Sequence, residues 1–197
     1  MNRSKLQILS RAIRQSAFDV LKKLDIENYC QTIGIDVNIV GSLKSDLMLN
    51  HRDIDLHLYS EEPIIEKSFS LIKQFATNNR VKDIQYKNLL DTKEECIEWH
   101  LLFENEDNEK WKLDIIHIRK GSYYDGYFEN VTERIIQKLT PETKNIILEI
   151  KYKLGAKSEI PGIQVYQAVL DCGVKNYTDF IDWQKNNSSN EILEWIP

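Results

Sequence analysis

The segment that decides the fold of this sequence is VGSLKSDLMLNHRDID, residues 40–55. It joins a short β-branched run, 36–40, to the strictly alternating run 53–59, and both runs are typical of strands. Side chains two apart on a strand point to the same face, so Asp53 and Asp55 project together while their neighbours face a core. Adjacent carboxylates raise each other's pKa unless a cation neutralises them. A hard divalent ion that takes oxygen ligands, Mg2+ above all, is the expected partner.

The end of the preceding strand carries Gly41 and Ser42, which indicate a phosphate site. Gly41 has no side chain, so a phosphate can approach its backbone closely, and Ser42 adds a hydroxyl donor at the same place. A turn that binds phosphate and a carboxylate pair that binds Mg2+ are the two parts that phosphoryl transfer needs from a nucleoside triphosphate site. The segment therefore predicts a nucleotide-binding site.

The pattern Gly41-Ser42-x10-Asp53-x-Asp55 resembles the signature of the DNA polymerase beta-like nucleotidyltransferase superfamily, which includes aminoglycoside and lincosamide nucleotidyltransferases and small stand-alone bacterial members. The resemblance implies a third carboxylate on a later strand, and Asp114 in the apolar run 113–116 matches it. By this resemblance the three aspartates are the catalytic residues, and Asp53 and Asp55 hold two Mg2+ ions. Asp114 completes one metal site and helps to deprotonate an acceptor hydroxyl, while Gly41 and Ser42 take the triphosphate.

The sequence departs from the family pattern directly after the Gly-Ser pair. Many bacterial members carry Ala-Arg-Gly there, whereas this chain has Leu-Lys-Ser-Asp at 43–46, so Lys44 is the candidate for the missing positive charge. The resemblance also offers Lys144, Lys151 and Lys153, on a predicted helix, as candidates for a contact with the β or γ phosphate. Of these we select Lys151. The alternative for all three is a solvated helix face.

The remaining pattern indicates an α+β fold with a nucleotidyltransferase-like mixed β-sheet, flanking helices and a C-terminal helical extension. An amphipathic helix is expected at 6–24, with Leu9 on its apolar stripe, and another from Pro63 to about 77. A β meander is expected at 81–89, 96–103 and 111–118. After the loop 121–126 the pattern becomes helical to the end, with helices at 141–154, 161–172 and about 178–184. We assign residues 1–120 to the catalytic domain and residues 121–197 to a packed helical region.

Composition limits the partners and the compartment. The 197 residues carry a net charge of -5, and the stretch 61–110 alone holds twelve acidic against seven basic side chains. An acidic balance makes nucleic acid an unlikely main partner. No apolar run is longer than three residues, so we expect no membrane span or secretory signal. The three widely spaced cysteines, Cys30, Cys96 and Cys172, fit buried thiols in a reducing, cytoplasmic compartment.

Two further groups have both a functional and a structural interpretation. His57 alternates onto the face of the aspartates, where it either lines the cleft or is a satisfied structural histidine. Tyr123, Tyr124 and Tyr127 lie beside a glycine-bounded loop, where they either shape an acceptor pocket or simply pack.

The sequence is best explained as an Mg2+-dependent nucleotidyltransferase. We expect ATP as the default donor of a nucleoside monophosphate, with pyrophosphate released and a hydroxyl of a small molecule or a protein as the acceptor. One alternative is a catalytically silent or antitoxin-like nucleotide-binding module. A less favoured one is a glycosyltransferase that grips a nucleotide sugar through Asp-x-Asp, since neither the Gly-Ser turn nor the third aspartate belongs to that pattern.

Overall fold

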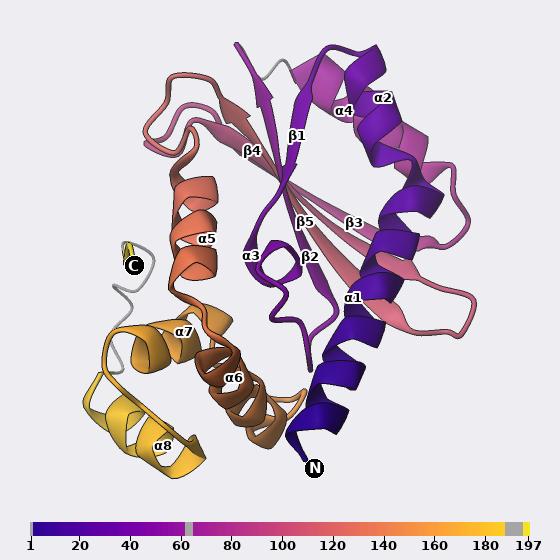
Figure 1. Ribbon diagram of the computed structural model, residues 1–197. Helices are drawn as coiled ribbons and strands as arrows, with labels where there is room; N and C mark the ends of the chain where they lie inside the picture. Colours follow the sequence, from indigo (N-terminus) through magenta and orange to yellow (C-terminus); the bar gives the residue numbers. More distant parts are fainter. Residues whose placement is uncertain (1, 62–64, 188–194) are drawn as a thin grey trace.

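The computed structural model describes residues 2–61, 65–187 and 195–197, and places a five-stranded sheet between helices on both of its sides (Figure 1). The strands are β1 (Asp36–Ile39), β2 (Asp53–Ser60), β3 (Val81–Leu89), β4 (Cys96–Glu104) and β5 (Lys110–Arg119). The helices are α1 (Arg3–Leu24), α2 (Ile26–Thr32), α3 (Gly41–Lys44), α4 (Ile65–Ala76), α5 (Tyr127–Lys138), α6 (Pro141–Leu154), α7 (Gly162–Leu170) and α8 (Tyr177–Asn186).

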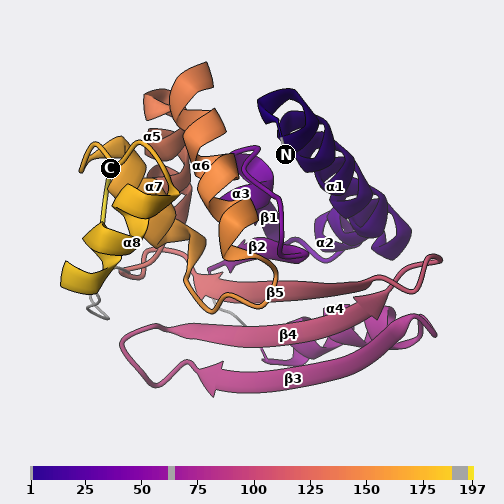
Figure 2. The same ribbon diagram turned by 90° about the horizontal axis from the view of Figure 1, so that it is seen from below.

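The sheet is mixed and has the order β1-β2-β5-β4-β3. Strands β3, β4 and β5 form the predicted antiparallel meander and lie side by side in Figure 2. Strand β1 pairs antiparallel with β2, whereas β2 pairs parallel with β5. The parallel pairing brings residues 53–60 beside residues 112–119, and this neighbourhood sets the position of the site described below.

One face of the sheet carries the larger hydrophobic core, which α1, α2 and α4 cover (Figure 1). The core contains Ile54 and Leu56 of β2, so the predicted alternation is confirmed over residues 53–56, whereas residues 57–60 are buried on both faces. The prediction for Leu9 of α1 was wrong, because Leu9 is 38% exposed while Ser10 is buried. The buried positions of α1 follow the helical repeat from Leu6 through Ser10, and Leu9 falls beside that stripe.

The other face of the sheet carries helices α5 to α8, which form a second hydrophobic cluster (Figure 1). Helix α6 begins where the sequence predicts it. The hydroxyl of Thr140 accepts from the backbone N–H of Thr143 at 3.1 Å, and Pro141 occupies the first turn. The predicted division at residue 120 remains a prediction, because this cluster includes Leu47 and a smaller cluster joins Leu6 and Leu49 to Leu148 of α6.

Several local features differ from the sequence interpretation. Helices α2 and α3 were not predicted, because each is only about one or two turns long. Pro63, the expected start of a helix, lies outside the described residues, and α4 is described from Ile65. Cys30 and Cys96 are buried as expected, but Cys172 is exposed because it lies in the turn that follows α7. None of the helices in the described part of the chain is long and apolar enough to cross a bilayer.

Candidate active site

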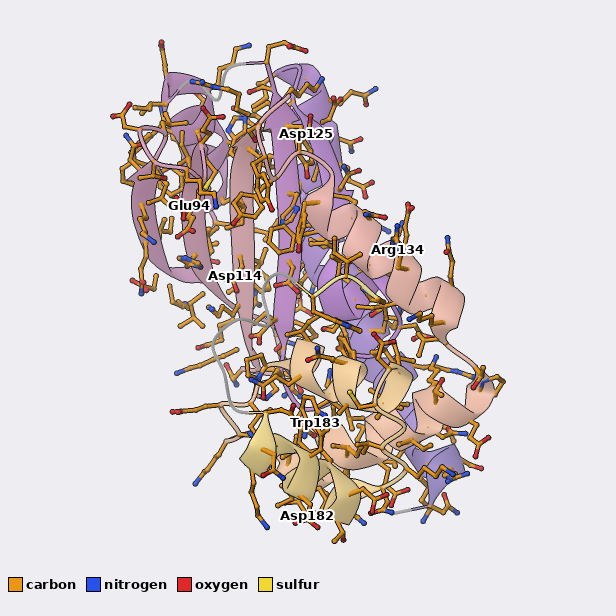
Figure 3. The ribbon with its side chains drawn as sticks, turned by 90° about the vertical axis from the view of Figure 1, so that its left-hand side faces the viewer. Glu94, Asp114, Asp125, Arg134, Asp182 and Trp183 are labelled. Atoms are coloured by element: carbon orange, nitrogen blue, oxygen red, sulfur yellow. The ribbon has the colours of Figure 1, made fainter. Side chains whose placement is uncertain are left out.

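A cavity of about 560 Å³ lies between the polar face of the sheet and the helical layer of α5 to α7. Six of the seven residues predicted for the site line it: Gly41, Ser42, Asp53, Asp55, Asp114 and Lys151. They come from α3, β2, β5 and α6. In Figure 3 Asp114 is labelled where the sheet meets the helical layer. The fold therefore gathers residues that are up to about a hundred positions apart in the chain.

The three aspartates meet because of the parallel pairing of β2 and β5. In this register Asp55 lies opposite Asp114, and Asp53 lies opposite Lys112. Paired residues of neighbouring strands project to the same face of a sheet. The third carboxylate, assigned from the family resemblance, thus lies beside the pair on β2.

Burial and mutual repulsion perturb the two carboxylates of β2. Burial, reinforced by Asp114 and Asp53, raises the pKa of Asp55 to about 6. Burial also raises the pKa of Asp53, although His51 and Lys112 oppose the shift. Carboxylates in this condition bind a proton or a cation more readily than exposed ones do. An all-oxygen donor set of this kind suits a hard divalent cation such as Mg2+.

Gly41 is required at its position by the carboxylate of Asp55. Its φ of +65° lies in the left-handed region, and a side-chain carbon built there would overlap that carboxylate. Its backbone N–H donates to Oγ1 of Thr132 on α5 at 3.2 Å. Its carbonyl accepts from both the backbone N–H and the hydroxyl of Ser45, at 3.1 and 2.9 Å. The predicted turn is thus the first turn of α3, held closely against the second aspartate.

Lys151 lies inside the cavity and is only 8% exposed, so the solvated-face interpretation was wrong for this residue. Its Nζ donates to the carbonyl of Leu47 at 2.6 Å and to the hydroxyl of Tyr166 at 3.2 Å. Burial lowers the pKa of Lys151 to about 8, against the opposing influence of Asp55 and Asp53. Helix α6 is buried on more than one side, and this places Lys151 among apolar neighbours.

The two other lysines proposed on α6 have carboxylate partners and do not line this cavity. Lys144 pairs with Asp46, and Nζ of Lys153 lies 3.2 Å from a carboxylate oxygen of Glu149. Lys151 is therefore the one lysine of these three that the fold brings to the aspartates.

Lys44 is not brought to the aspartates, in contrast to the expectation that it supplies charge to the phosphate site. It lines a second cavity of about 250 Å³ together with three glutamates, Glu27, Glu129 and Glu133. Ser42 and Lys44 are two residues apart on α3, and side chains at that spacing point to roughly opposite sides of a helix. Since Ser42 faces the main cavity, Lys44 faces away from it.

The carboxylate of Asp114 accepts hydrogen bonds from two side chains of this protein, His100 and Lys112. One carboxylate oxygen, Oδ1, is in contact with Nδ1 of His100, and the other, Oδ2, accepts from Nζ of Lys112 at 3.0 Å. Burial alone would lower the pKa of Lys112, but the hydrogen bond and charge of Asp114 outweigh it and raise that pKa. Within the described ranges, no three His, Cys, Asp or Glu side chains are arranged to hold a metal ion as they stand.

Sequence reasoning missed both of these partners. Lys112 is two residues from Asp114 on a predicted strand, so alternation alone indicates that the two share a face. His100 lies on β4, and its position opposite Asp114 depends on the register of two strands. No local pattern in the sequence carries that information.

His57 both lines the cavity and has a structural partner, so its two interpretations hold together. Its Nδ1 lies 3.3 Å from Oε1 of Glu129, whose carboxylate also accepts from the hydroxyl of Tyr59 at 2.8 Å. Burial alone would raise the pKa of Glu129, but the hydrogen bonds and charge of His57 and the bond from Tyr59 lower it. This cluster fastens the start of α5 to β2.

The tyrosines of the loop before α5, and Tyr127 at the start of that helix, pack mainly on one another and on Phe128. Tyr123 stacks on Tyr127 with ring centroids 6.2 Å apart, and Tyr124 stacks on Phe128 at 5.6 Å. Phe128, and none of these tyrosines, lines the main cavity. The acceptor role considered for the tyrosines is thus not favoured by their placement.

Comparisons with known proteins identify the fold. Neither a family model nor a curated protein matches the sequence. The Cid1 poly(U) polymerase bound to MgGTP matches with a TM-score of 0.52 and 14% identity, over 74% of this chain and 42% of that chain. The GLD-2/RNP-8 complex matches with a TM-score of 0.58 and 11% identity, over 98% of this chain and 75% of that one.

The chain spans less than half the length of the first Cid1 chains that it matches, 42% and 45%. Identities of 11% to 14% show the fold alone, and they do not confirm the small bacterial subfamily expected from the sequence. The α+β fold class predicted from the sequence is confirmed. The chain has a mixed α+β fold that it shares with these matched structures.

Proposed function

We propose that this protein is an Mg2+-dependent nucleotidyltransferase that moves a nucleoside monophosphate from a nucleoside triphosphate, ATP by default, to a hydroxyl group. One observation carries the proposal: a single cavity holds Asp53, Asp55 and Asp114 together with the Gly41-Ser42 turn and Lys151. A carboxylate cluster for a cation, beside backbone and side-chain donors for phosphate, is the equipment of phosphoryl transfer. The likeness in fold to polymerases solved with Mg-nucleotides supports it.

Asp53, Asp55 and Asp114 would hold the divalent cation, and the proposal includes two ions. The raised pKa values of Asp53 and Asp55 support this assignment, because the pair lacks sufficient compensating charge within the protein. Bound Mg2+ supplies charge that stabilises both the attacking and the leaving oxygen of an in-line displacement. For Asp114 to take part, Lys112 has to release the oxygen that it holds.

The phosphates would lie against Gly41, Ser42 and Lys151. With a pKa of about 8, Lys151 is mostly protonated at neutral pH, so its Nζ can neutralise phosphate charge inside a largely buried site. The acceptor oxygen forms a bond to the α phosphorus, and the bond from that phosphorus to the bridging oxygen of the β phosphate breaks. The hydroxyl proton passes to Asp114, and pyrophosphate leaves.

The comparisons add a class of molecule to the candidate acceptors of the nucleoside monophosphate. Our expectation was a small molecule or a protein, with nucleic acid unlikely because of the net charge. One matched Cid1 structure is described by its RNA terminal uridylyl transferase activity, so an RNA 3′ hydroxyl joins the candidates. None of the described residues of 61–110, the stretch with the excess acid, lines the cavity, so the net charge of the chain says little about this site.

Calorimetric titration of Mg-ATP tests the nucleotide site. We expect wild type and Asp83→Asn to bind, the latter being a control at an exposed aspartate of β3, and Asp53→Asn to bind at least ten-fold more weakly. Equal binding by wild type and Asp53→Asn would overturn the proposal. Removal of Mg2+ by EDTA should weaken binding to wild type in the same way.

Turnover separates an enzyme from a silent module. Wild type is incubated with Mg2+ and α-phosphate-labelled nucleoside triphosphates, in the presence of a single-stranded RNA or of a panel of hydroxylated small molecules. Label on the RNA assigns one acceptor class, and label on a small molecule assigns the other. Tight Mg-ATP binding without pyrophosphate release in any mixture would contradict the enzymatic proposal and favour a nucleotide-binding module.

A further inference from the structure

Asp114 differs from the other two aspartates in how it is held. Asp53 and Asp55 lie on β2, and Asp114 lies on the neighbouring strand β5. The side chain of Asp114 has a direct partner on β4, the strand on the other side of β5. His100 lies opposite Asp114 in the antiparallel register, and its Nδ1 is in contact with Oδ1 of the carboxylate. A carboxylate oxygen can only accept in such a bond, so Nδ1 of His100 donates. The third carboxylate thus has a fixed donor on one of its two oxygens.

His100 is itself positioned by the sheet. Its ring is 32% exposed, and its Nε2 lies 3.8 Å from a carboxylate oxygen of Glu98, two residues earlier on the same face of β4. On the outer side β3 places Gln85 opposite it. His100 does not line the main cavity, so it reaches Asp114 from the side away from the nucleotide site.

The second partner of Asp114 has a different character. Lys112 is 52% exposed and holds Oδ2 through a long flexible side chain, at 3.0 Å. An ammonium group on such a stem can move away without any change in the backbone, whereas the imidazole of His100 sits on a paired strand. Lys112 therefore occupies Oδ2 of Asp114, the oxygen that would bind a metal ion. His100 holds Oδ1 of the same carboxylate.

We propose that His100 is a positioning residue for the third carboxylate: it holds Oδ1 of Asp114 so that Oδ2 faces the divalent cation when Lys112 withdraws. This role rests on the proposed function, because it assumes that Asp114 shares a metal ion with the aspartates of β2. Groups that hold a ligating carboxylate contribute to metal affinity, and their loss typically costs 10-fold to 100-fold.

The test is whether the loss of His100 and the loss of Lys112 change the affinity for a divalent cation in opposite directions. The probe is Mn2+ in the presence of α,β-methylene ATP, an analogue that cannot release pyrophosphate, and free Mn2+ is followed by electron paramagnetic resonance. We expect His100→Ala to weaken Mn2+ binding by about ten-fold and His100→Asn, which keeps an N–H donor, to recover most of it. Lys112→Met should strengthen binding, since it removes a competitor for Oδ2. Gln85→Ala, on the same face, should behave as wild type.

The results separate this role from simpler ones. Unchanged Mn2+ affinity in His100→Ala would overturn the inference. So would a shift in the same direction in His100→Ala and Lys112→Met, which is what a purely electrostatic influence of the two donors predicts. Failure of His100→Asn to recover affinity would also count against it. Thermal denaturation of each metal-free variant shows whether it is folded, and His100→Asn carries the test if His100→Ala is not.

Failure of this inference and failure of the proposed function are distinguishable in the same assay. If Asp53→Asn retains wild-type binding of Mn2+ with the analogue, the proposed function fails. If Asp53→Asn loses binding while His100→Ala keeps it, only the role of His100 fails.

Discussion

Asp55→Asn should stabilise the metal-free protein while it removes the binding of Mg-nucleotide. Burial, with Asp114 and Asp53 nearby, raises the pKa of Asp55 from 3.8 to about 6. A tenfold change in proton affinity corresponds to about 1.4 kcal/mol, so the charged form costs the folded state at most about 3 kcal/mol. An amide of nearly the same shape carries no charge, and we expect it to recover about 1–3 kcal/mol above pH 7.

The pH dependence follows from the sign of that shift. The folded state binds the Asp55 proton more tightly than the unfolded state, so the metal-free wild type loses stability as pH rises from about 4 to about 6. Below about pH 4 the carboxyl is protonated in both states and the contribution vanishes. The advantage of Asp55→Asn should therefore be full at pH 7.5 and small at pH 4.

Urea unfolding in EDTA at pH 4, 6 and 7.5 measures this advantage. Wild type and Asp55→Asn are compared with Asp83→Asn, which changes an exposed aspartate of β3 and should have little effect at any pH. Added Mg-ATP should then stabilise wild type by mass action and leave Asp55→Asn unchanged. A destabilised Asp55→Asn at pH 7.5, or a gain that does not vary with pH, would refute the argument that a buried, repelled carboxylate lies at this position.

Three further expectations concern the surroundings of the aspartates. Gly41→Ala should cost about 2 kcal/mol or more in urea unfolding, because it strains a positive φ and overlaps a carboxylate. Gly121→Ala, where φ is also positive but the space is open, should cost less, and equal losses would contradict the overlap. Lys151→Met should weaken Mg-ATP binding by calorimetry, whereas Lys153→Met should not. Wild-type affinity should also fall as pH rises through about 8, where Lys151 loses its charge; a flat profile from pH 7 to 9 would count against the phosphate contact. Tyr59→Phe removes the hydroxyl that donates to the carboxylate of Glu129 on α5. The free energy of unfolding in urea should fall by about 1 kcal/mol, and an unchanged value would mean that this hydrogen bond does not hold α5 in place.

The strands and the long helices could be predicted because their side chains alternate or repeat over a few neighbouring residues. All five strands and the long helices follow from alternation or from the helical repeat, since side-chain burial on one face is written in residues that are close in sequence. The short α2 and α3 escaped because one or two turns carry too little periodicity. The resemblance on Gly41, Ser42, Asp53 and Asp55 then supplied the expectation for Asp114, which no local pattern identifies by itself.

The sequence by itself determined that Asp53 and Asp55 share a face, that Gly41 precedes them at the end of a strand, and that the chain forms a mixed sheet with a helical tail. Only the tertiary structure decided which partners these residues meet. The parallel register of β2 and β5 sets Asp114 beside Asp55, and the register of β4 gives Asp114 its partner His100. The packing of α6 buries Lys151 in the cavity, and the turn of α3 directs Lys44 away from it. Alternation and helical repeat act over a few residues, whereas strand pairing and helix packing join segments far apart in the chain, so the second set of facts has no local signal.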